Sequence, residues 1–184
     1  MKKILSLMIT LCLLCMSAAT LAETAKEATK LELDGFTLNL TNGEFYTVNE
    51  KVANQPYIVV LPFYASGDMT TNYTFAWNDG VFELTIEGIK TINSMMEQQL
   101  RTLYGSYGYT IDSFTIEDPY EATLSDTDCF VVDMVTVLSN AGQKAYTYQR
   151  QIYIPSIDHY ITLSTTSPEA LETITQQIAD SITF

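Results

Sequence analysis

The sequence is poor in the residues from which reactive sites are usually built. It has three cysteines, one histidine and one tryptophan among 184 residues. Cys12 and Cys15 lie in an apolar N-terminal stretch, so Cys129 is the single cysteine of the remaining chain and an intramolecular disulfide is excluded there. The hydrophobic core therefore has to hold the fold without a covalent cross-link.

Positive charge is also scarce. Nine Lys and Arg residues stand against 22 Asp and Glu residues, which gives a formal net charge of −13. Such a surface repels a phosphate backbone and anionic lipid, so we expect neither a nucleic-acid partner nor a charged membrane surface. The sequence also lacks a G-x-S-x-G motif, a glycine-rich phosphate loop and a zinc-protease motif, and we therefore expect no cofactor.

The N-terminus has the three parts of a secretory signal peptide. Lys2 and Lys3 precede an apolar run of roughly a dozen residues, and the small-residue stretch Ser17–Ala22 follows. We predict a signal peptide over residues 1–22, cut after Ala22, with a cut after Ala19 as the alternative. The run is shorter than the ~20 residues that a transmembrane helix needs. Leu14 stands before Cys15 where a lipobox needs a small residue.

Cleavage there leaves 162 residues with seven Lys and Arg against 22 Asp and Glu, a net charge of −15. We expect a soluble protein in the periplasm or the medium. Residues 23–32 are charged and lack strand periodicity, which predicts a flexible linker. Residues 33–184 contain no repeat and no Pro/Gly-rich break, so we predict one domain.

Turn residues between alternating apolar segments predict three β-hairpins. The first joins Phe36–Leu40 to Glu44–Val48 through the turn Asn42-Gly43. The second joins Tyr73–Asn78 to Val81–Ile86 through Asp79-Gly80. The third joins Thr127–Leu138 to Gln143–Ile154 through Asn140-Ala141-Gly142. The first turn sets Leu40 opposite Phe45, and the second sets Trp77 opposite Phe82.

The third hairpin has two plausible registers. A three-residue loop pairs Phe130 with Ile152 and Met134 with Tyr148, whereas a four-residue loop pairs Phe130 with Gln151 and Met134 with Thr147. We favour the three-residue loop because apolar cross-strand pairs stabilise a sheet.

Further strands are predicted at 57–62, 109–116 and 157–165, and two helices accompany them. The first helix follows the spacing of Ile92, Met96, Leu100, Leu103 and Tyr107. The second begins with Ser167 as N-cap and Pro168 in the first turn, and it buries Leu171, Ile174, Ile178 and Ile182. The predicted class is α+β, a largely antiparallel β-sheet flanked by helices.

The closing stretch carries a family resemblance. Tyr146–Ile154, His159–Ser164 and a C-terminal helix that ends at Ile178–Phe184 follow an N-terminal hairpin and a long helix. This order resembles the PsbP-like, or Mog-like, fold family, which includes bacterial secreted members. The resemblance implies an α/β/α sandwich and a binding or assembly role without enzymatic activity.

A few isolated polar residues are the candidates for a site. Arg150 and Asp133 interrupt apolar strands, and the three-residue loop places Arg150 opposite Val132, either in an ion pair or at an anion-binding site. His159 and Cys129 could form an imidazole–thiol pair, but Cys129 lies in an ordinary strand and is expected to be a buried, inert thiol.

Acidic residues offer little for a metal. Asp126 and Asp128 lie near Glu121 but lack the spacing of a calcium loop, so no metal site is predicted.

We therefore expect an exported, non-catalytic module that binds another protein or an envelope component. The alternative is a secreted enzyme or a binder of small ligands or anions that uses Asp133, Arg150, His159 and Cys129. Convergence of these four side chains in one concave pocket would favour the alternative.

The export prediction is tested at the N-terminus of the recovered protein. Expression of the full chain in a secreting bacterium should place a protein that begins at Glu23 in the soluble periplasmic or culture fraction, as N-terminal sequencing would show. Recovery of a chain with Met1 in the membrane pellet would contradict this prediction.

Overall fold

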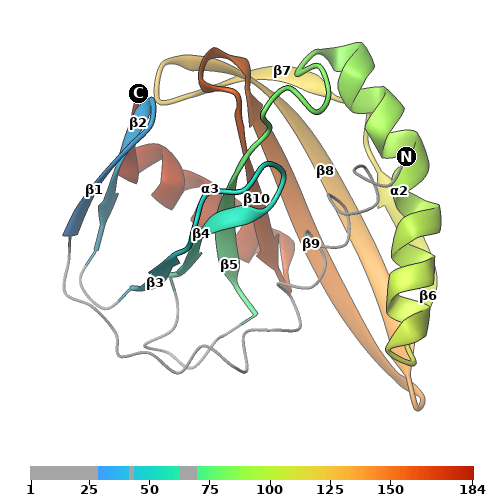
Figure 1. Ribbon diagram of the computed structural model, residues 1–184. Coiled ribbons are helices and arrows are strands. Elements are labelled where there is room, and N and C mark those ends of the chain that lie inside the picture. The colour runs from blue at the N-terminus through green and yellow to red at the C-terminus, as the bar shows by residue number, and fades with distance from the viewer. Residues whose placement is uncertain (1–28, 42–43, 63–69) are drawn as a thin grey trace.

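The fold is built on a long antiparallel sheet that has a layer on each face (Figure 1). A computed structural model describes residues 29–41, 44–62 and 70–184. The strands are β1 (Thr29–Leu33), β2 (Phe36–Leu40), β3 (Phe45–Val48), β4 (Pro56–Leu61), β5 (Asn72–Trp77), β6 (Thr110–Ile116), β7 (Tyr120–Leu124), β8 (Thr127–Asn140), β9 (Gln143–Ile154), β10 (His159–Thr165) and β11 (Ile182–Thr183). The helices are α2 (Ile86–Ser106), α3 (Pro168–Ser181) and the 3₁₀ turn η3 (Pro155–Ile157).

The strands form two sheets. The large sheet has eight strands in the order β3-β4-β5-β10-β9-β8-β6, and β7 pairs with the part of β8 that β6 leaves free. The small sheet has the order β1-β2-β11. The recorded pairings in both sheets are antiparallel, so the predicted α+β class is confirmed.

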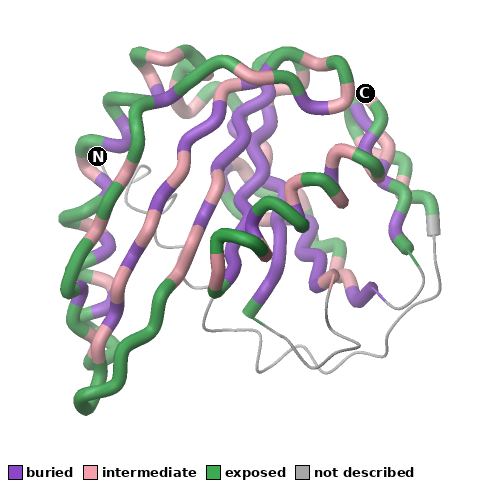
Figure 2. Tube along the Cα trace, turned by 180° about the vertical axis from the view of Figure 1, so that it is seen from behind, coloured by how far each residue is buried: buried purple, intermediate pink, exposed green. Residues whose placement is uncertain are grey.

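Each face of the large sheet has its own core. Strand alternation sends Cys129 and Val131 of β8 toward α3 and the small sheet, while Val132 and Met134 face α2. Figure 2 shows the buried residues running along the central strands and the inner sides of the helices. The small sheet and α3 cover one face of the large sheet and α2 covers the other (Figure 1).

Local capping signals place the helices. Ser167 accepts a hydrogen bond from the backbone N–H of Ala170 at 3.1 Å, with Pro168 in the first turn, so the predicted start of α3 is confirmed. Thr85 caps α2 in the same way, accepting from the N–H of Gly88 at 3.2 Å. That cap starts α2 at Ile86, a turn and a half before the first apolar position of the predicted helix.

The hairpin predicted at Asp79-Gly80 is wrong in its second strand. Asp79 and Gly80 have the expected positive φ of 51° and 63°, but residues 81–86 lead into α2, and Trp77 lies opposite His159 rather than Phe82. Both edges of β5 are occupied by β4 and β10. The carboxylate of Asp158 also accepts hydrogen bonds from the Gly80 N–H and the Asn78 side chain, which holds the turn against η3.

The predicted pairing of Leu40 with Phe45 is also wrong. Strand β2 pairs with β1 and β11, and β3 pairs with β4, so the two segments belong to different sheets. The turn Asn42-Gly43 lies outside the described residues. Strand β1 begins at Thr29, inside the predicted linker 23–32, because Leu31 and Leu33 alternate into the core beside β2.

The long hairpin has neither of the two registers weighed from the sequence. Its turn has two residues, Ala141 and Gly142, with φ of 50° and 81°, and Asn140 pairs with Gln143. The register therefore shifts by one residue from the predicted one, and Phe130 lies opposite Tyr153. Asp133 therefore lies directly opposite Arg150, and this pair of opposite charges replaces the predicted pairing of Arg150 with Val132. Strand β10 likewise starts at His159 and not at 157, because residues 155–157 form η3.

The turn between β1 and β2 gives a stability prediction. Gly35 has a φ of +85°, and a Cβ added there would lie 2.6 Å from Cγ2 of Ile157 in η3. Gly142 has a similar φ of +81°, but its added Cβ would meet nothing within 4 Å. We expect Gly142→Ala to lower the free energy of unfolding by about 1–2 kcal/mol, and Gly35→Ala by about 2–4 kcal/mol because overpacking adds to backbone strain.

Urea denaturation of the two variants, with the wild type beside them, measures this difference. Equal losses would show that the small sheet does not depend on close contact between Gly35 and Ile157.

Candidate functional site

Arg150 is the half-buried centre of an ion-pair network between the sheet and α3. Its Nε and Nη2 donate to the two carboxylate oxygens of Asp133 at 2.7 and 2.9 Å, in the bidentate geometry that favours an arginine–carboxylate pair. Nη1 and Nη2 also donate to the carboxylate of Glu172 at 3.2 and 2.9 Å, and Nη1 donates to the hydroxyl of Thr175 at 3.1 Å. The side chain of Arg150 is 12% exposed.

These contacts use the whole donor capacity of the guanidinium. An arginine has five N–H donors, and Arg150 makes five hydrogen bonds to protein acceptors. Asp133 and Glu172 raise the pKa of Arg150 against the opposing effect of its burial. This arrangement favours the ion-pair alternative, and an anion would have to displace existing contacts to bind here.

His159 is held in a single neutral form. Its Nδ1 lies 2.5 Å from the carbonyl oxygen of Ile157, which can only accept, so Nδ1 carries the proton. Nε2 then accepts from the hydroxyl of Tyr57 at 2.7 Å. Burial lowers the pKa of His159, and the nearby positive charge of Lys51 lowers it further. Both ring nitrogens are occupied, so His159 has no free nitrogen with which to act as a base.

A cation closes the outer side of this histidine cluster. Lys51 Nζ lies 4.3 Å from the centre of the Trp77 ring and 2.9 Å from a carboxylate oxygen of Asp34. Trp77 pairs with His159 across β5 and β10. The contacts tie together the loop before β4, the turn after β1 and the start of β10, which is a stabilising role.

Cys129 is a buried thiol beside a small cavity. It is 4% exposed, and burial together with the charge of Asp128 raises its pKa to about 11, which disfavours the thiolate. The cavity has a volume of about 260 Å³. Its described lining residues are Glu121, Ala122, Asp128, Cys129, Phe130 and Pro155. Asp133, Arg150 and His159 are not among them.

The sequence candidates are therefore spread over the sheet. Arg150 pairs with Leu163 of β10, and His159 lies four residues away along that strand, a spacing of about 13 Å. A ligand or partner at Arg150, Asp133 and His159 stays a prediction of the sequence, and the four side chains of the enzyme hypothesis do not line a common cavity in the described structure.

Asp126 belongs to a tight turn rather than to a calcium loop. Ser125 and Asp126 have φ of 46° and 64° and connect β7 to β8. Within residues 29–41, 44–62 and 70–184, no group of three His, Cys, Asp or Glu side chains is placed to hold a metal ion.

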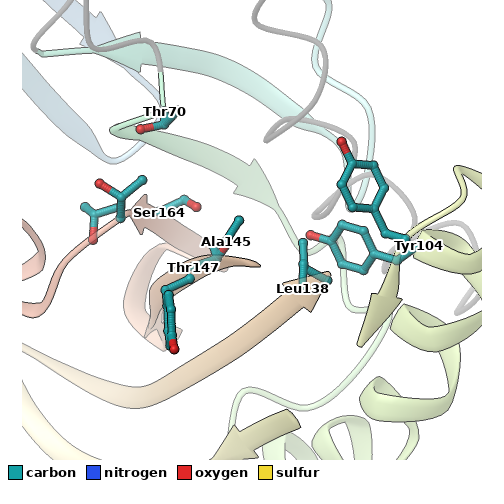
Figure 3. A pocket seen from close by; sticks show the side chains of 10 residues that line it. Thr70, Tyr104, Leu138, Ala145, Thr147 and Ser164 are labelled. Atoms are coloured by element: carbon teal, nitrogen blue, oxygen red, sulfur yellow. The ribbon is translucent and has the colours of Figure 1, made fainter. Parts of the chain in front are cut away.

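A different cavity lies where the β8–β9 hairpin extends past the end of β10. Its volume is about 300 Å³. The described residues that line it are Thr70, Tyr104, Tyr109, Leu138, Ala145, Tyr146, Thr147, Ser164, Thr165 and Thr166, none of which is charged. Figure 3 shows Tyr104 and Leu138 on one side, Thr70 and Ser164 on the other, and Ala145 and Thr147 between them.

The pairing of β9 with β10 explains why this cavity exists. Strand β10 ends at Thr165, opposite Tyr148, so the residues of β9 from Gln143 to Thr147 have no partner strand on that side among the described strands. The end of α2 and the start of β6 bring Tyr104 and Tyr109 over the same region, with ring centres 6.5 Å apart at 75°. Sequence reasoning missed the cavity, because its lining residues come from segments that are far apart in the chain.

Comparison with known proteins supports the fold. The solution structure of cyanobacterial PsbP (CyanoP) from Synechocystis sp. PCC 6803 is similar over 88% of this chain and 94% of its own, with a TM-score of 0.52 and 9% sequence identity. A Pseudomonas aeruginosa protein of unknown function, PA94, matches 80% of this chain and 88% of its own, with a TM-score of 0.33 and 10% identity, too low to support a shared fold.

No protein-family model matches the sequence, and neither does any curated protein. The first structural match shows that the PsbP-like fold expected from the sequence is present. At 9% identity it shows the fold alone.

The buried histidine gives a pH prediction. The ordinary pKa of histidine is about 6.5, and burial lowers that of His159 in the folded protein. Between the two values the unfolded chain binds a proton that the folded chain does not, so this stabilising contribution is complete above about pH 6.5 and is lost as the pH falls through the folded pKa.

The non-titrating variant His159→Gln isolates this contribution. Glutamine keeps a donor and an acceptor at the site. In urea titrations we expect the free energy of unfolding of the wild type to fall more than that of the variant as the pH is lowered from about 7.5 to about 5. Parallel pH profiles would show that His159 is protonated equally in both states.

Proposed function

We propose that this protein is an exported, non-catalytic module that binds another secreted protein or a component of the cell envelope. The observation that carries the proposal is the state of its reactive side chains. The guanidinium of Arg150 has five protein acceptors, both ring nitrogens of His159 have partners, and the thiol of Cys129 has a pKa raised to about 11. Groups that are fully engaged by the fold stabilise it and leave little for catalysis.

Two further features support this assignment. The N-terminal pattern of lysines, apolar run and small residues is typical of export. The uncharged cavity next to the unpaired section of β9 offers hydroxyl groups and aromatic rings, which suit recognition better than acid–base chemistry.

Cys129 and His159 provide the direct test against the enzyme alternative. With its pKa raised, the Cys129 thiol of the native protein should react slowly with iodoacetamide at neutral pH and stoichiometrically only after denaturation. The variant His159→Gln should not change the native rate. Cys129→Ala should lower the free energy of unfolding by about 1–2 kcal/mol, as expected for a small buried group, and should leave binding unchanged.

Fast stoichiometric alkylation of the folded wild type, suppressed by His159→Gln, would establish a catalytic pair and overturn the proposal. A pull-down from the envelope fraction of the native host, made with the wild type and Cys129→Ala in parallel, supplies the positive side of the test. Equal retention of the same component by both proteins is the expected result.

A further inference from the structure

The open section of β9 is the segment Gln143–Thr147, which belongs to an inner strand but lacks one neighbour. Strand β9 lies between β8 and β10 in the large sheet, and β10 ends at Thr165, opposite Tyr148. Beyond that point β9 is paired with β8 alone among the described strands. Residues 143–146 are exposed, and Figure 2 shows the end of this hairpin in the colour of exposed residues. The sheet therefore has a vacant strand position directly after the end of β10.

The backbone of the open section is oriented to pair with a strand at this vacant position. The hairpin has a two-residue turn, so alternation along the antiparallel ladder directs the N–H and C=O groups of residues 143, 145 and 147 toward β8. Those of Lys144 and Tyr146 face the vacant position. The carbonyl of Tyr148 continues the same series, and it accepts from the hydroxyl of Thr165 on β10 at 3.5 Å. A row of such groups at an open edge is a template for another extended chain.

Two adjoining cavities lie beside the open section on the side of α2. The tyrosine-lined cavity of about 300 Å³ and a second cavity of about 350 Å³ share Tyr109, Leu138 and Ala145 in their linings. The first reaches the residues at the end of β10, and the second reaches Asn140 and Gln143 at the tip of the hairpin. The vacant position and the two cavities therefore run along the same five residues of β9.

The small side chain of Ala145 leaves room in the middle of this groove. Ala145 pairs with Leu138, whose side chain belongs to the core beneath α2. A residue placed opposite Ala145 on an added strand points to the same side of the sheet, where Tyr104 and Tyr109 also line the cavity. Residues opposite Lys144 and Tyr146 point to the other side. The groove therefore fits an apolar side chain at alternate positions of an added strand.

We propose that an extended segment of a partner protein adds to β9 at the vacant position, with an apolar side chain opposite Ala145 and without acidic residues. Main-chain hydrogen bonds to Lys144 and Tyr146 supply affinity, and the cavity supplies the preference for the apolar side chain. The inference rests on the proposed binding function, and it specifies that the bound component is a protein and how its chain is held.

Charge restricts the sequence of the partner segment. The chain has a net charge of −13, which attracts basic segments and repels acidic ones. Among the described residues that line the two cavities, Lys144 is the charged one, and its Nζ already lies 3.2 Å from a carboxylate oxygen of Asp112. We therefore expect basic or uncharged side chains at the outward positions of the segment.

A second copy of this chain fits the vacant position less well. Antiparallel pairing of two open sections about a two-fold axis would set Ala145 opposite Ala145, and two methyl groups would leave the cavity unfilled. A stable dimer buries about 800 Å² on each partner, which is more than a five-residue strand supplies. Two copies would also repel each other through their net charge of −13. These arguments favour a partner of different sequence.

The experiment uses protein from expression of the full chain, with its N-terminus determined by mass spectrometry. The probe is acetyl-Lys-Val-Thr-Leu-Thr-Val-Lys-amide, whose central leucine can lie opposite Ala145, and an acidic peptide has glutamate in place of both lysines. Titrations followed by amide chemical shifts give the site and the affinity. We expect saturable shifts at residues 143–147 with the basic peptide, and binding of the acidic peptide about tenfold weaker or more.

Two N-methylated forms of the basic peptide separate backbone pairing from side-chain contact, and they leave the protein unchanged. Methylation of the two threonines removes the N–H groups that face Lys144 and Tyr146 in the added strand, so it should weaken binding about tenfold or more. Methylation of the two valines changes N–H groups that point away from β9. This peptide is the matched control and should bind about as well as the parent.

Variants of the open section test the same contacts from the protein side. Tyr146→Pro removes an N–H that faces the vacant position, whereas Tyr146→Val removes the ring and keeps that N–H. We expect the proline variant to bind the basic peptide about five- to tenfold more weakly than the valine variant. Ala145→Phe should weaken binding about tenfold because its ring takes the space of the leucine. Tyr107→Ala is the control, because Tyr107 is 47% exposed and lines neither cavity.

Four results would each overturn the inference: equal binding of the two N-methylated peptides, equal binding by the two variants of Tyr146, tighter binding of the acidic peptide, or no saturable shift at residues 143–147. A dimer seen in sedimentation that Tyr146→Pro dissociates would assign the position to a second copy and would also overturn it. These outcomes leave the non-catalytic function standing. Fast alkylation of Cys129 that depends on His159 would overturn that function and leave strand addition untouched.

Discussion

The bidentate pair between Arg150 and Asp133 and the two-residue turn Ala141-Gly142 specify the same register of the β8–β9 hairpin, and the two faces of the large sheet depend on that register. A shift by one residue would turn one strand over relative to the other. Either Val132 of β8 would then leave the α2 core, or Gln151 of β9 would leave its place beside Thr162. Glu172 and Thr175 extend the same network onto α3, so the guanidinium of Arg150 links the hairpin to the helix.

The two faces of the large sheet are filled by side chains of different chemistry. The face toward α3 and the small sheet is filled by aliphatic and aromatic side chains, and their burial stabilises the described residues, among which Cys129 is free. The face toward α2 combines a smaller apolar core with amide and hydroxyl groups, some without partners in the described residues. Buried polar groups without partners cost stability, so this face contributes less to the free energy of folding than the apolar face does.

Elements with local signals were predictable, and elements set by distant partners were not. The cap at Ser167 and the spacing of Leu171, Ile174 and Ile178 located α3, because both signals lie within a few residues. Asp79 and Gly80 adopted the predicted dihedral angles, yet the expected second strand is absent because β10 takes its place beside β5. Local sequence rules do not predict which of two distant segments pairs with β5.

The surroundings of the candidate residues were not predictable for a related reason. Arg150 was recognised as a residue that needs a partner, but its register depended on Ala141 adopting a positive φ, which a non-glycine residue seldom does. The tyrosine-lined cavity draws residues from Thr70 to Thr166, whose proximity only the topology creates. The buried state of Cys129 was predictable, since its alternation with neighbouring apolar residues is local.

Strand β11 also determines the order in which the fold can be completed. Ile182 and Thr183 pair with Leu38 and Thr37, so one edge of β2 stays open until residues near the C-terminus arrive. A chain that emerges N-terminus first therefore cannot complete its small sheet until its synthesis is almost finished. Both ends of the described chain then become part of one three-stranded sheet, in which β2 joins β1 to β11.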